Sequence, residues 1–123
     1  MTSISLNGNV GRPSPLVHAD FDSDGHEDLA LGGDSTRAVW VLLGNGDGTF
    51  QDLVGYGSAS TFGSPVNLAT GDFNHDGHID IAAPEYFSDI VDVFLGVGNG
   101  TFAPALPQSL PSLSNSEGIA VAD

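Results

Sequence analysis

The stretch DFDSDGHED (20–28) returns as DFNHDGHID (72–80), 52 residues further along the chain. At this offset 34 residue pairs starting at Asp20 align without a gap, and 15 of them are identical. A third start follows near the C-terminus, where GIAVAD (118–123) is similar to NLATGD (67–72). Repeats of this length are typical of solenoids, propellers and arrays, so the chain is predicted to contain two full structural units.

Each unit contains four short runs that favour β-strands. The 17 glycines and seven prolines suit short strands joined by tight turns better than they suit helices. Between the third and fourth runs lie GNGDG (44–48) and GVGNG (96–100), whose Gly and Asn residues supply the positive φ of a tight hairpin. The expected strands are 15–21, 27–33, 38–44 and 49–56 in the first unit and 66–73, 79–86, 90–96 and 101–107 in the second.

Apolar residues occupy both faces of the third expected strand in the first unit. The period of two places Val39 and Val41 on one face and Trp40 and Leu42 on the other. A sheet stacked between two neighbours buries both faces, which explains this nearly continuous apolar run. In the second unit Asp92 takes the place of Trp40, and we expect it to lie near the rim of the sheet.

These features predict an all-β chain of two four-stranded antiparallel blades of a β-propeller. The expected organisation is an N-terminal strand or tail at 1–10, a first blade at 11–62 and a second blade at 63–114, followed by the first strand of a truncated third repeat at 115–123. Two blades leave two outer faces bare. We therefore expect the propeller to be completed by oligomerisation, with about three or four copies in a ring, or the chain to be a segment cut from a larger propeller.

The repeated acidic run has the spacing of a cation-binding loop. Oxygen ligands at positions 1, 3 and 5 can converge when the chain curls, glycine at position 6 allows the bend, position 7 offers a carbonyl and position 9 closes the shell. Such hard oxygen ligands favour Ca²⁺, two ions per chain, over Mg²⁺ and Zn²⁺. The expected metal ligands are Asp20, Asp22, Asp24, His26 and Asp28 in the first loop and Asp72, Asn74, Asp76, His78 and Asp80 in the second.

The EF-hand shares this spacing but requires a bidentate glutamate at position 12 and flanking helices. Position 12 is Leu31 in the first loop and Ala83 in the second, and the flanking residues favour strands. An EF-hand is therefore excluded. For the histidines at position 7, we expect the backbone carbonyl rather than the ring to serve as the ligand.

Charge and composition exclude several classes of protein. The 123 residues carry 16 acidic and two basic side chains, a formal net charge of −14, which is unsuited to nucleic acid. The absence of cysteine excludes disulfides and thiolate sites. The N-terminal residues show no signal peptide, and no apolar run has the roughly 20 residues of a membrane helix.

The chain resembles two units of the FG-GAP (VCBS-type) repeat family, whose repeats form the blades of integrin-α-like propellers. The resemblance rests on ADFDSDGHEDLAL (19–31) with VWVLLGNGDGTFQ (39–51) and on GDFNHDGHIDIAA (71–83) with VDVFLGVGNGTFA (91–103). It implies a calcium ion in the loop between the first and second strands of each blade. It also implies extracellular adhesion, glycan recognition or accessory roles. Propellers of this family usually have about seven blades, whereas this chain has two.

No nucleophile–base pair or phosphate-cradling loop is evident in the sequence, so we predict that the chain is not an enzyme. Some polysaccharide lyases resemble this architecture and keep a calcium-dependent enzyme open as the alternative. Arg12 and Arg37 as the only cations make that alternative unpromising. Trp40, Tyr86 and Phe87 are the candidate aromatic residues for binding a glycan or protein ligand.

Overall fold

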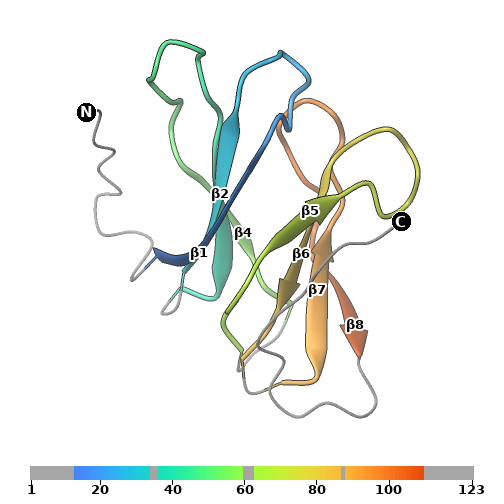
Figure 1. Cartoon of the computed structure of the whole chain (residues 1–123). Coiled ribbons are helices and arrows are strands. Elements are labelled where there is room, and N and C mark those ends of the chain that lie inside the picture. The colour runs from blue at the N-terminus through green and yellow to red at the C-terminus, as the bar shows by residue number, and fades with distance from the viewer. Residues whose placement is uncertain (1–12, 34–35, 60–62, 87, 110–123) are drawn as a thin grey trace.

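The computed structural model describes residues 13–33, 36–59, 63–86 and 88–109 and places them in two four-stranded antiparallel sheets (Figure 1). Within these residues the structure contains no helix. The first sheet has the strand order β1-β2-β3-β4. Its strands are β1 (Pro13–Ala19), β2 (Asp28–Gly33), β3 (Ala38–Leu42) and β4 (Val54–Gly57).

The second sheet repeats the first in both order and strand direction. Its order is β5-β6-β7-β8, and each strand pairs with the next along the chain. The strands are β5 (Ala69–Gly71), β6 (Asp80–Pro84), β7 (Ile90–Phe94) and β8 (Leu106–Ser109). The predicted all-β fold of two four-stranded blades is thereby confirmed. The expected segments 1–10 and 115–123 lie outside the described residues.

The fourth strand of each sheet starts later than the sequence predicts, because each carries a one-residue bulge. Phe50 bridges Gly44, but the continuous ladder resumes only where Val54 faces Val41. Four steps on one strand thus oppose three on its neighbour, which is the geometry of a β-bulge. The same mismatch separates the Gly96–Phe102 bridge from the Val93–Leu106 pair.

The core lies between the two sheets. We call the side of a sheet that carries Val39 and Val41, or their equivalents Val91 and Val93, its front face, and the opposite side its back face. The front face of the first sheet packs against the back face of the second, and we call this contact the joint. Its buried residues are Phe21, Ala30, Val39, Val41, Leu68, Ile81, Ala83, Phe94 and Phe102.

Asp92 does not lie near the rim, and the sequence prediction for it is wrong. It is 0% exposed on the back face of the second sheet, opposite Ala83. The hydroxyl of Ser58 donates to its Oδ2 at 2.6 Å, and the amide of Ala59 donates to the same oxygen at 3.0 Å. Asp92 is buried because the segment after β4 supplies donors to it across the joint.

Candidate metal centre

The first acidic loop, between β1 and β2, is curled by hydrogen bonds from its own backbone. The amides of Asp24 and Gly25 donate to the two carboxylate oxygens of Asp20, at 3.1 and 2.9 Å. The amide of Asp24 also reaches Asp22 Oδ1 at 3.2 Å, and the amide of His26 donates to Asp24 Oδ1 at 2.8 Å. Gly25 has φ +87°, the left-handed conformation that glycine adopts without strain, so the predicted bend at position 6 is present.

The second loop, between β5 and β6, repeats this pattern. The amides of Asp76 and Gly77 donate to the two oxygens of Asp72 at 3.0 and 2.9 Å, and the amide of His78 donates to Asp76 Oδ1 at 2.9 Å. Asn74 replaces Asp22 and accepts from the Asp76 amide at 3.3 Å. The two loops, which share six of their nine residues, therefore adopt the same curl.

The aspartate at position 9 fastens each loop to the rest of its sheet. Asp28 is 0% exposed, and its Oδ2 accepts from the amide of Phe21 while its Oδ1 accepts from the amide of Gly44, both at 2.7 Å. Asp80 makes the same two contacts, with Phe73 and Gly96, at 2.8 Å each. A carboxylate oxygen can accept more than one bond, so this role leaves lone pairs for a cation.

Three carboxylates of the first loop converge. Ligand oxygens of Asp20, Asp22 and Asp28 all lie within 4.8 Å of one another. Asp24, which was also predicted to be a ligand, is not in that group. Burial and the nearby Asp28 carboxylate raise the pKa of Asp22, whereas the Gly25 amide lowers the pKa of Asp20. In the second loop, the His78 amide lowers the pKa of Asp76.

The histidines at position 7 turn their rings toward the neighbouring hairpin. A Cβ added at Gly46 would lie 2.4 Å from the His26 ring, and one at Gly98 would lie 2.5 Å from the His78 ring. Both glycines have positive φ. Each ring thus packs on the GNGDG-type turn, and the close approach explains why glycine occupies these two turn positions.

A comparison with protein-family models matches residues 20–83 to the family described as FG-GAP-like repeat. The match spans more than half of the 123 residues and includes both acidic loops. The chain belongs to the FG-GAP-like repeat family. Neither the curated proteins nor the solved structures gave a match. The matched residues lie in two blade-like sheets.

FG-GAP-like repeats often bind calcium, and the donor set of this chain fits that ion. The converging groups of the first loop are all carboxylates, the hard oxygen donors that Ca²⁺ prefers. Burial, followed by the charge of the nearby Asp28 carboxylate, raises the pKa of Asp22, and a bound cation would favour its ionised form. Asn74 also offers an oxygen, so the second loop keeps the donor type with one charge fewer.

Trp40 and Tyr86, two of the predicted ligand-binding aromatic residues, belong to different sheets. Trp40 is half-buried on the back face, packs over Gly55 and donates from Nε1 to the hydroxyl of Thr36 at 3.0 Å. Tyr86 is 37% exposed in the turn after β6. Phe87 lies outside the described residues.

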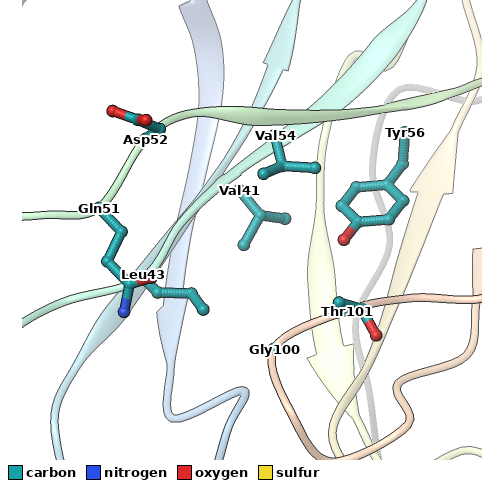
Figure 2. A pocket seen from close by; sticks show the side chains of 8 residues that line it. All are labelled: Val41, Leu43, Gln51, Asp52, Val54, Tyr56, Gly100 and Thr101. Atoms are coloured by element: carbon teal, nitrogen blue, oxygen red, sulfur yellow. The ribbon is translucent and has the colours of Figure 1, made fainter.

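A groove of about 460 Å³ opens between the two repeats beside the joint (Figure 2). Valine and leucine side chains and the Tyr56 ring form its apolar part, and polar groups lie around it. The sequence analysis missed this groove, because it forms where the second repeat's hairpin turn meets β3 and β4. Its lining residues are Val41, Leu43, Gln51, Asp52, Val54, Tyr56, Gly100 and Thr101.

Among the described residues, no helix is both long enough and apolar enough to cross a membrane.

Proposed function

We propose that this chain is a calcium-stabilised β-propeller repeat module with a structural or recognition role outside the cell. The observation that carries the proposal is the duplicated curl of the acidic loops, in which the same backbone amides hold the same carboxylates at both sites. The convergence of three carboxylates, with ligand oxygens within 4.8 Å of one another, also supports it, because a bound cation would offset their mutual repulsion.

The residues proposed to hold the first ion are Asp20, Asp22, Asp24 and Asp28, with the carbonyl of His26. Bound calcium would neutralise this crowded negative charge. The chain's own residues supply the support, since Asp28 links the loop to the amides of Phe21 and Gly44. Metal binding is therefore coupled to the position of the hairpin that follows β3.

Native mass spectrometry in calcium tests this proposal. We expect two calcium ions per chain, one for each loop. Asp22→Ala should remove one ion, while Asp89→Ala, which changes an exposed acid in the turn before β7, should remove none. A spectrum without bound calcium, or equal loss of calcium in both variants, would contradict the assignment to the loops.

The same spectrum measures assembly, for which we propose a ring of about three or four copies. Leu16 is 58% exposed on the back face of the first sheet, whereas its equivalent in the second repeat, Leu68, is 4% exposed within the joint. The joint unites two different faces, so a second copy can use the same contact at each free face, and repeated rotation closes a ring. Leu16→Ser should lower the number of copies. A 12.6 kDa species alone for the unchanged protein would contradict the ring.

For recognition, we propose that a glycan or protein ligand binds at the groove or at Tyr86. The groove combines an apolar wall with Gln51, Asp52 and Thr101, the mixture that orients a polar ligand. A glycan array with the Asp52→Ala and Tyr86→Ala variants separates the two surfaces.

We propose no catalytic activity for the module, and turnover of an acidic polysaccharide in a lyase assay would contradict this.

A further inference from the structure

Two acidic side chains outside the loops are buried together in the joint. Glu85, directly after β6, and Asp92, in the middle of β7, are both 0% exposed. Ala83 is opposite Asp92 in the ladder, and Glu85 is two residues beyond Ala83, so both acids lie on the back face of the second sheet. The two acids are seven residues apart in the sequence, and no local pattern pairs them.

The described residues supply fewer hydrogen-bond donors than the carboxylates of Glu85 and Asp92 have oxygens. Ser58 and Ala59 both donate to Oδ2 of Asp92. Among the residues that the structure describes, Asp92 Oδ1 and both carboxylate oxygens of Glu85 are buried with no hydrogen-bond partner. Two ionised carboxylates in such surroundings would each lose solvation and would also repel each other.

Among the described residues, the elements packed around Glu85 bring no opposite charge to its carboxylate. The segment 63–67 pairs with the end of β6 through the Pro65–Glu85 bridge and contains no titratable residue. On the first sheet, the carbonyl of Arg37 accepts from the Ser58 amide at 2.8 Å, and the Arg37 side chain is exposed. In the β6–β7 turn, Tyr86 and Asp89 are exposed. Burial, followed by the charge of Asp92, raises the pKa of Glu85 to about 7.

The blade fold itself does not require this pair. The equivalent positions in the first repeat are Gly33 and Trp40, and neither carries an acid. Space around Glu85 is limited, since a Cβ on Gly63 would lie 2.6 Å from its Oε2. A proton therefore suits the pair better than a metal ion with its shell of ligands.

We propose that Glu85 and Asp92 share one proton at neutral pH and thereby make the joint between the two repeats sensitive to pH. The proton resides on Glu85 and is directed toward the unoccupied Oδ1 of Asp92. As the pH rises through neutrality the proton leaves, two buried negative charges face each other, and the joint is weaker than in acid. The effect does not depend on calcium.

The sign of the pH dependence follows from the direction of the pKa shift. The carboxyl of Glu85 binds its proton more tightly in the folded chain than in the unfolded chain, where the pKa is near 4.5. Its contribution to stability is therefore complete below pH 4.5 and is lost as the pH rises to about 7. Cation binding by the acidic loops contributes stability that is lost as the pH falls. The two effects therefore have opposite pH dependence and can be separated.

The test compares melting temperatures of the full chain and of Glu85→Gln, which imitates the protonated acid. Both are measured in sodium buffers with chelator, at fixed protein concentration, from pH about 5.5 to about 8.5. The unchanged protein should lose about 5 °C or more as the pH rises. Glu85→Gln should be flat by comparison and should melt higher at the alkaline end. Every other side chain is the same in the two proteins, so the difference between the two slopes is assigned to Glu85.

Asp89→Asn is the matched control and should keep the full pH dependence of the unchanged protein. Carboxyl-carbon NMR gives a second reading, in which Glu85 should titrate near pH 7. An unchanged slope in Glu85→Gln, or a Glu85 midpoint near 4.5, would overturn the shared proton. Low stability of Glu85→Gln at every pH would also overturn it, because the joint would then require a charged carboxylate and its counter-ion.

Discussion

Asp28→Ala is expected to destabilise the chain by about 3 kcal/mol or more, even in chelator. Removal of the carboxylate leaves the amides of Phe21 and Gly44 without their buried acceptor, and each hydrogen bond to a charged group contributes about 1.5–3 kcal/mol. Small domains are stable by only about 5–15 kcal/mol, so the loss is a large part of the total. Urea unfolding in chelator measures it. The same change at Asp80 should act alike, because its two contacts are the same.

Asp24→Ala is the control for this prediction. Asp24 is exposed, and among the described residues its carboxylate accepts only the His26 amide of its own loop, so its loss in chelator should cost far less. If Asp24→Ala and Asp28→Ala proved equally destabilising without calcium, the separate structural role of Asp28 would be refuted.

Gly44→Ala is the second change with a large expected effect. A Cβ at this position would lie 2.2 Å from the carbonyl oxygen of Glu27, a backbone atom that cannot move aside as a flexible side chain can. Crowding of this kind costs about 1–3 kcal/mol, and here it would also strain the Gly44 amide bond to Asp28. Thermal unfolding should show a clear decrease in melting temperature, and Gly96→Ala should repeat it, since its Cβ would lie 2.1 Å from the carbonyl of Ile79.

Gly57→Ala provides the matched control, because a Cβ there would have no neighbour within 4 Å. Loss of glycine from the unfolded chain should make this change neutral or slightly stabilising. Equal destabilisation by Gly44→Ala and Gly57→Ala would show that backbone crowding beside Glu27 is not the cause.

The fold and the loops were predictable because they depend on local patterns that occur twice. The period of two in 38–44 fixed which side chains share a face, and the acidic spacing with glycine at position 6 fixed the loop curl. The turns also followed from their glycines, since Gly46 and Gly98 adopt the positive φ that their sequence indicates.

The joint was not predictable, because it depends on contacts between residues far apart in the chain. Asp92 appeared to be a departure from an apolar pattern, and only the folded chain brings Ser58 and Ala59 to it across 33 or 34 residues. Glu85 and Asp92 lie on the same face of the second sheet but come from different parts of its β6–β7 pair, so no local pattern in the sequence pairs them. The extra residue before Val54 gives no local signal, so the fourth strand was predicted to start too early.

Only part of the environment of Asp28, the aspartate at position 9, was predictable from its spacing. Its spacing correctly placed Asp28 beside Asp20 and Asp22. No local pattern indicates that both of its oxygens also accept hydrogen bonds from backbone amides, one of them from Gly44, which follows β3. Asp28, which its spacing predicts to be a metal ligand, is thus also a structural link between the loop and the hairpin after β3. Substitution of Asp28 alone therefore cannot prove metal binding.

The most direct test of the central claim is therefore the melting temperature of the unchanged chain in calcium and in excess chelator, at constant pH and protein concentration. An ion that binds only the folded state at about 100 times its dissociation constant contributes about 2.7 kcal/mol per site. With two sites, we predict that calcium raises the melting temperature by about 10 °C or more and that Asp22→Ala removes about half of the increase. Identical melting temperatures in calcium and chelator would contradict the account of these loops as calcium sites.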